Sequence, residues 1–132
     1  MSKKFTLIPL VAALFSGSLF AAVEPVTLED LPLLKQESQH GTASKRVANL
    51  FTRSHYTPVR FNDELSSKVF DRYIESLDFN KSVFLKSDVD SFEQYRNCFD
   101  NALLSGQLGF TFDIFNLSLK RRFERYEFSL SL

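Results

Sequence analysis

The strongest structural signal in this 132-residue chain is a series of apolar side chains with helical spacing between residues 63 and 77. The series consists of Leu65, Val69, Phe70, Tyr73, Ile74 and Leu77. Successive members are adjacent or three to four positions apart, so they share one face of an α-helix. Asn62 is a favourable N-cap, and the carboxylates of Asp63 and Glu64 suit the positive end of the helix dipole. The pattern predicts a helix over residues 63–77 that buries one face.

Weaker helical patterns precede this segment. Residues 34–40 have helical character, and Gly41 predicts a break after them. A separate helix is expected over residues 43–54. Its apolar face would consist of Val47, Leu50 and Phe51. Pro58 then favours an extended link to the helix at 63–77.

Further helices are expected on the C-terminal side. Residues 78–86 predict a loop with apolar side chains that pack down, and Ser87 predicts the cap of a helix over residues 88–104. Gly106 is expected to end that helix, and a last helix should begin after Gly109. The apolar face expected for the last helix consists of Phe112, Phe115, Leu119, Phe123, Tyr126 and Leu130.

These patterns predict an all-α fold, in which residues 35–132 form a small domain of about four to five helices with an open-ended last helix. Strand-like alternation is weak throughout, and no internal repeat is visible. The chain has fifteen phenylalanines, and each buries a large ring, so a few short helices can build a core. An N-terminal arm, residues 23–34, should precede the domain, with Thr27 capping a short turn and four leucines tucked against later helices.

Residues 1–22 have the order of a secretory signal peptide. Lys3 and Lys4 form a positive start, and an apolar stretch of about 11 residues precedes small residues at Ala21 and Ala22. The stretch is shorter than the roughly 20 residues that span a bilayer. We therefore predict export with cleavage near Ala22. A retained anchor, with inner-membrane association, is the competing interpretation.

The single cysteine, Cys98, excludes a disulfide within the chain. Tyr95, Phe99 and Ala102 surround it in the helical pattern. We therefore expect Cys98 to be a buried apolar side chain rather than a nucleophile.

The sequence predicts no catalytic, cofactor-binding or metal-binding residue. The four glycines are dispersed, so there is no phosphate-binding loop, and no cysteine–histidine cluster suggests zinc. His40 and His55 are expected to form structural hydrogen bonds. Sixteen basic and sixteen acidic residues balance, which gives no support for a nucleic-acid partner.

Two further arrangements of residues in the sequence bear on chemistry. The serine–lysine pairs, such as Ser44–Lys45 and Ser67–Lys68, are adjacent in sequence, so on a helix their side chains point apart and do not form a dyad. The basic run at residues 120–126 contains Phe123 and Tyr126. We interpret it as two core-facing rings among solvated charges rather than as an RNA-binding stripe.

Several strings in the chain match one family in order. They lie at residues 35–40, 51–56, 69–73, 77–78, 87–89, 116–117 and 120–126. The strings Phe-Thr-Arg-Ser-His-Tyr at 51–56 and Lys-Arg-Arg-Phe-Glu-Arg-Tyr at 120–126 are the most specific. From about Leu31 to Leu132 the chain resembles the N-terminal region of the tail-specific proteases, members of the carboxy-terminal processing peptidases (family S41).

This resemblance implies the N-terminal helical scaffold or interaction domain of a periplasmic serine endopeptidase that degrades proteins from apolar C-termini. Complete members add a PDZ domain and a protease domain with a Ser-Lys dyad, and neither has a counterpart here. The implied partners are those two domains and an envelope adaptor protein, and protein substrates would be reached only through the missing domains. The chain alone is therefore not expected to be an enzyme.

Two interpretations of the short length remain. The final residues of the chain show no helix stop signal, so we expect Leu132 to be a truncation point within a longer sequence. The alternative is a stand-alone periplasmic helical adaptor that binds the protease or another envelope protein.

Overall fold

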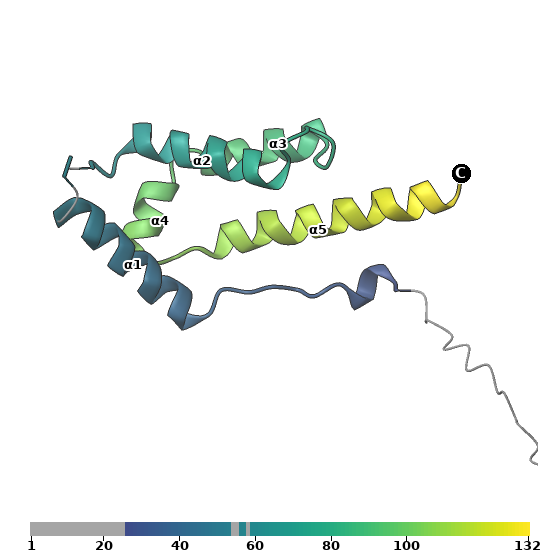
Figure 1. The fold of residues 1–132 in the computed structure, drawn as a ribbon, viewed down its shortest axis with the longest axis horizontal. Helices are drawn as coiled ribbons and strands as arrows, with labels where there is room; N and C mark the ends of the chain where they lie inside the picture. Colours follow the sequence, from purple (N-terminus) through teal and green to yellow (C-terminus); the bar gives the residue numbers. More distant parts are fainter. Residues whose placement is uncertain (1–25, 54–55, 58) are drawn as a thin grey trace, which may run out of the picture.

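The computed structural model describes residues 26–53, 56–57 and 59–132, and these residues form helices and connecting loops without a strand. The helices are α1 (Ser38–Arg53), α2 (Asp63–Leu77), α3 (Lys86–Phe92), α4 (Phe99–Ser105) and α5 (Gly109–Leu130), with short 3-10 turns η1 (Leu28–Asp30) and η2 (Glu93–Tyr95). Helix α5 lies between the α2–α3 pair and the extended N-terminal arm, and α1 crosses one end beside α4 (Figure 1). The all-α prediction is confirmed.

Helix α2 forms as the sequence predicts. Asn62 Oδ1 accepts a hydrogen bond from the Leu65 N–H at 3.0 Å, which caps the first turn. Phe70 is 2% exposed and joins three other buried side chains in the core: Phe92, Phe99 and Ile114. Tyr73 packs against them and donates its hydroxyl to the Thr111 carbonyl at 2.6 Å. Burial raises the pKa of Tyr73 to about 12.

Gly41 does not break a helix, contrary to the prediction. Helix α1 runs through it without interruption. Gly41 is buried where α1 crosses the end of α4, and a Cβ atom at this position would lie 2.7 Å from the Gly106 carbonyl oxygen. Gly41 therefore allows the backbones of α1 and of the residue after α4 to approach closely. From the local sequence alone, a glycine needed for such a contact looks the same as a glycine that ends a helix.

The helix expected over residues 88–104 is divided into three parts: α3, η2 and α4. Helix α3 also begins earlier than predicted, at Lys86, because the Asp88 carboxylate accepts the Leu85 N–H at 3.0 Å. The division lets Phe92 and Phe99 both reach the core, and the buried Ser66 hydroxyl accepts the Phe99 N–H at 2.8 Å.

The same division overturns the prediction that Cys98 is buried. Cys98 is a free, exposed cysteine in the turn before α4. Residues 96–98 form a turn between η2 and α4, so the continuous helical spacing that would have placed Cys98 beside Tyr95 and Ala102 is absent. Gly106, by contrast, ends α4 as predicted, with the left-handed φ of 73° typical of a helix C-terminus.

The apolar face predicted for α5 is only partly correct. The residues that α5 buries are Ile114 and Ser118, and Phe110 and Leu117 pack on the core, whereas the distal residues of the predicted face are exposed. The members of the predicted face from Phe112 to Phe123 are partly buried, and the most deeply buried side chains of α5 lie on a neighbouring face, at Ile114 and Ser118.

The predicted short turn in the arm is confirmed. The Asp30 carboxylate accepts hydrogen bonds at 2.8 Å from both the N–H and the hydroxyl of Thr27. Residues 1–22, predicted to be a signal peptide, lie outside the described residues. No helix in the part of the chain that the structure describes has the length and apolar character to cross a membrane.

Candidate interaction surface

His40 has the structural role that the sequence suggests. Its Nδ1 atom accepts the Glu37 N–H at 3.0 Å, before the first turn of α1. Its ring lies 5.3 Å from the Phe112 ring of α5, measured between centroids. The imidazole thus fixes the junction between the arm and α1. His55, the other histidine, lies outside the described residues.

Ser44 and Ser67, the serines of the two Ser–Lys pairs considered in the sequence, form hydrogen bonds within the fold. Ser44 is buried and donates its hydroxyl to the Leu103 carbonyl at 2.9 Å, which joins α1 to α4. Ser67 accepts a hydrogen bond from Arg96 at 3.0 Å. Within residues 26–53, 56–57 and 59–132, no group of three or more acidic, histidine or cysteine side chains is placed to hold a metal ion.

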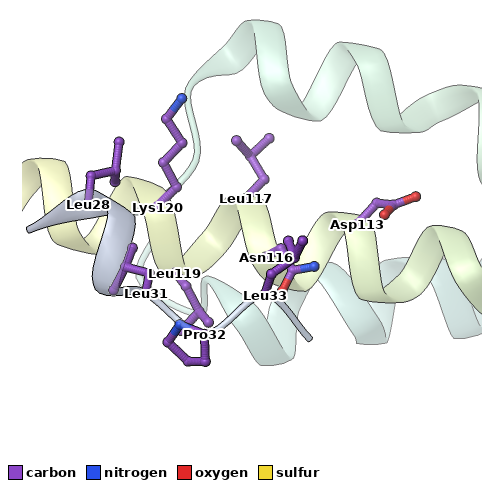
Figure 2. Close-up of a pocket in the computed structure, with 9 residues that line it drawn as sticks. All are labelled: Leu28, Leu31, Pro32, Leu33, Asp113, Asn116, Leu117, Leu119 and Lys120. Atoms are coloured by element: carbon purple, nitrogen blue, oxygen red, sulfur yellow. The ribbon is translucent and has the colours of Figure 1, made fainter. Parts of the chain in front are cut away.

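The arm and α5 form a shallow apolar crevice of about 370 Å³. Figure 2 shows Leu31 and Pro32 of the arm beside Leu119 of α5, with Asp113 and Lys120 also lining the crevice. The leucines predicted to tuck against later helices therefore meet α5, although Leu33 and Leu34 remain partly in solvent, at 68% and 42% exposure.

Two side-chain amides hold the arm in place. The Asn116 side chain accepts the Leu34 N–H at 3.0 Å and donates to the Leu34 carbonyl at 2.8 Å. Gln36 donates to the Gly106 carbonyl at 2.5 Å and accepts the Leu108 N–H at 2.6 Å. Each amide therefore satisfies one backbone donor and one backbone acceptor that lie outside the helices. Neither contact was predicted, because the partners lie 70 to 82 positions apart in the chain.

The basic side chains of the run at 120–126 are solvent-exposed as predicted, apart from the half-buried Arg121, but the arginines also bind distant parts of the fold. Arg121 contacts both carboxylate oxygens of Asp88, at 2.8 and 2.9 Å, and also binds Glu124 at 2.8 Å. Arg125 donates to the Ser82 carbonyl at 2.9 Å, and Arg122 donates to the Leu77 carbonyl. The three arginines therefore fasten α5 to α2, the following loop and α3.

The Asp88–Arg121 pair is the most enclosed ion pair among the described residues. The two side chains are 9% and 23% exposed, respectively. The hydrogen bonds from Arg121 hold the pKa of Asp88 below its ordinary value. From the sequence, residue 88 is expected only as the first position of a helix, and no local pattern indicates its pairing with α5, 33 positions away.

The C-terminal turns of α5 extend past the α2–α3 pair (Figure 1). Large apolar side chains are exposed on several sides of these turns: Tyr126 at 58%, Phe128 at 64% and Leu130 at 69%. Tyr126 had been predicted to face the core. A helix end that is apolar on several sides is normally buried by another surface.

A family model described as the tail-specific protease N-terminal domain matches residues 47–132, which include the second half of α1 and all of α2 to α5. The chain is also 45% identical over 103 residues to the tail-specific protease of Haemophilus influenzae. That similarity covers 77% of this chain and 14% of the relative, so the chain spans a small part of that protein's length.

Proposed function

Because the chain belongs to the family of tail-specific protease N-terminal domains, we propose that it is the helical scaffold and interaction domain of a periplasmic C-terminal processing endopeptidase. Such an enzyme would degrade proteins from apolar C-termini, with a Ser-Lys dyad supplied by a separate domain. In this proposal residues 1–22 are the signal peptide, 23–34 the arm and 35–132 the helical domain. The named relative, a tail-specific protease, supports the proteolytic context.

The exposed apolar end of α5 is the observation that carries the scaffold role. Phe128 and Leu130 are each more than 60% exposed on a helix that Arg121 holds rigidly against α3. A fixed apolar helix end of this kind is suited to packing against a larger body, because burying each side chain stabilises a contact by about 1.5–3 kcal/mol. We therefore assign this end to contact with the PDZ and protease domains.

Association in trans tests this assignment. The purified chain is mixed with a tail-specific protease from which the region matching this chain has been removed, and binding is measured by size-exclusion chromatography with light scattering. We expect a complex, and we expect Phe128→Lys with Leu130→Lys to abolish it. The matched control is Val26→Lys with Leu33→Lys, which places the same charges on exposed apolar residues of the arm. Failure of the unaltered chain to bind would refute the scaffold role.

Proteolysis by the chain alone is the second test. The purified chain is incubated with an unfolded reporter that ends in apolar residues. We expect the reporter to remain intact, and to be cleaved only by a sample that contains the protease domain. Cleavage by a preparation free of other proteases would show that the chain carries a catalytic site of its own.

Localisation is tested by fractionation of cells that express the full chain. We expect the protein in the periplasmic fraction, and we expect N-terminal sequencing to show cleavage after Ala21 or Ala22. Recovery of the uncleaved chain with the inner membrane would instead support a retained anchor.

A further inference from the structure

An apolar hollow of about 270 Å³ lies beside the second half of α1. Every residue that lines the hollow is apolar, and the lining comes from α1, α2, α4 and the segment just before α2. It includes Val47, Phe51, Val59, Phe61, Leu65 and Leu103. Val47 is 51% exposed, so the lining is open to solvent on this side. The hollow therefore offers room for a large apolar side chain of another molecule.

The outer face of α1 extends this apolar surface and adds charge to it. Leu50 is 60% exposed and lies about one turn beyond Val47. Arg46 precedes Leu50 by four positions and Arg53 follows it by three, so the two arginines flank Leu50 on one face of the helix. The arginines are therefore about two turns apart, with an apolar side chain between them.

The basic side chains of this region are unpaired. Four of them lie on α1 or between α1 and α2: Lys45, Arg46, Arg53 and Arg60. All four are exposed, and in the part of the chain that the structure describes none of them forms an ion pair. Helix α1 itself contains no acidic residue. Its positive charge is therefore not neutralised along the helix.

The acidic residues of neighbouring elements do not neutralise this charge either. Glu64 on α2 is bound by Lys68 at 2.7 Å. Asp63 is exposed at the start of α2 and Asp100 of α4 is buried, and neither lies within ion-pair distance of the four bases. Residues 41–69 thus contain five basic and two acidic residues in a chain that is neutral overall. The surface combines an apolar hollow with an uncompensated positive charge.

We propose that the outer face of α1 and the hollow beside it dock an acidic amphipathic helix of a partner protein. Apolar side chains of that helix enter the hollow and cover Leu50, and aspartate or glutamate residues pair with Arg46 and Arg53. A helix that lies along α1 repeats its side chains at the same interval, so carboxylates two turns apart match the two arginines. The apolar contacts supply affinity, and the charges select the partner.

This surface is separate from the one assigned to the protease domains. Helix α1 crosses the end of the fold opposite to the exposed end of α5 (Figure 1). The proposal therefore extends the interaction role proposed above: one end of the domain would contact the rest of the enzyme, and the other end would hold an acidic partner.

Two other occupants match this surface less well. The exposed end of α5 in a second copy offers apolar side chains, but its Glu124 is already bound by Arg121 and Lys120, which leaves Glu127 as the carboxylate to meet four cations. An anionic membrane would attract the arginines, but a flat surface leaves the hollow between α1 and α2 unfilled. The combination of hollow and charge therefore favours a different protein.

The experiment selects ligands from a displayed library of amphipathic helical peptides in which the positions beside the apolar residues vary among acidic, neutral and basic. The full chain is the bait. We expect enrichment of peptides with aspartate or glutamate at those positions. A labelled enriched peptide should then bind in a fluorescence anisotropy titration, and its affinity should fall as salt rises.

Charge reversal locates the site. Arg46→Glu with Arg53→Glu should weaken binding of the enriched peptide at least about tenfold, and should favour a version of the peptide with lysine in place of its acidic residues. Lys81→Glu with Lys86→Glu changes the net charge equally at exposed positions after α2, and should have little effect. Circular dichroism checks that each variant remains folded.

A second pair of variants tests the hollow. Val47→Asp places a charge on its lining at a half-exposed position, and should weaken the peptide at least about tenfold because the charge would have to be desolvated. Val26→Asp makes the same change on the arm, where valine is 61% exposed, and should leave the affinity unchanged.

Several outcomes would overturn the proposal. They are selection of no peptide, selection of peptides without acidic residues, and unchanged affinity in the Arg46→Glu with Arg53→Glu variant. Sedimentation with anionic phospholipid vesicles that is lost in this variant, when no peptide is selected, would make a membrane the occupant. Oligomers that disappear both in this variant and in Phe128→Lys with Leu130→Lys would make a second copy the occupant.

The scaffold role is tested separately. The Arg46→Glu with Arg53→Glu variant should retain association in trans through α5, because the altered residues lie at the opposite end of the fold (Figure 1). A failure of this proposal therefore remains distinguishable from a failure of the scaffold role.

Discussion

At the scale of single residues, Gly41 shows how one hydrogen atom in place of a side chain sets the position of a helix. Alanine normally stabilises a helix by about 0.5–1 kcal/mol relative to glycine. Here the added Cβ would meet the Gly106 carbonyl oxygen at 2.7 Å, and overpacking of this kind costs about 1–3 kcal/mol.

We therefore predict that Gly41→Ala lowers the free energy of unfolding by roughly 1 kcal/mol. Gly109→Ala is the matched control, because a Cβ there would meet no atom within 4 Å. It should be neutral or stabilising. Urea denaturation followed by circular dichroism measures both, and a Gly41→Ala variant more stable than the unaltered chain would contradict the close approach of α1 and α4.

The Asp88–Arg121 pair predicts a dependence of stability on pH. The pKa of Asp88 is lower in the folded chain than in the unfolded chain, because Arg121 binds its carboxylate. The stabilisation is therefore complete above the unfolded pKa of about 3.9, and is lost as the pH falls through the lower folded pKa.

Asp88→Asn should lower the free energy of unfolding by about 2–4 kcal/mol at pH 7, because it leaves Arg121 without its enclosed partner. The difference from the unaltered chain should shrink as the pH falls below about 4. Urea midpoints at several pH values measure this. Glu64→Gln, which breaks an exposed pair with Lys68, is the control and should have little effect. A constant difference at all pH values would argue against the role of the charge.

At the scale of elements, the arm depends on a side chain of α5. Asn116 binds both backbone groups of Leu34. We predict that Asn116→Ala releases residues 26–34 and speeds their cleavage in limited proteolysis, with only a small loss of global stability, because the arm is largely exposed. Asn49→Ala removes an exposed bond within α1 and should leave cleavage of the arm unchanged. Equal cleavage rates in the two variants would contradict the anchoring role.

Elements with local signals were predicted well, and those shaped by distant contacts were not. Helix α2 has an N-cap, an acidic first turn and one apolar stripe, all within 16 residues, so its bounds followed from the sequence. The segment from α3 to α4 has an equally continuous apolar pattern. It divides because Ser66, some 30 positions away, holds the Phe99 N–H and the Arg96 carbonyl. No local pattern indicates such a bond.

At the scale of the whole molecule, the exposed end of α5 should govern association. We predict that the purified chain forms oligomers at high concentration, because exposed apolar patches promote contact between copies. Phe128→Lys with Leu130→Lys should shift the protein to a monomer with little change in stability, since both residues are exposed. Light scattering over a concentration series measures this, and a monomeric unaltered chain at high concentration would contradict it.

The sequence by itself determined the all-α class, helix α2 with its Asn62 cap, the end of α4 at Gly106 and the resemblance to tail-specific proteases. These features depend on periodicity, caps and exact strings, which act within a few residues. The tertiary structure alone decided that α1 continues through Gly41, that Cys98 is exposed and which face α5 buries. It also revealed Asn116, Gln36 and Arg121 as the side chains that hold the arm and α3 against the rest. Each of these outcomes depends on a contact with a backbone or charge distant in sequence, and such contacts exist only once the helices have packed.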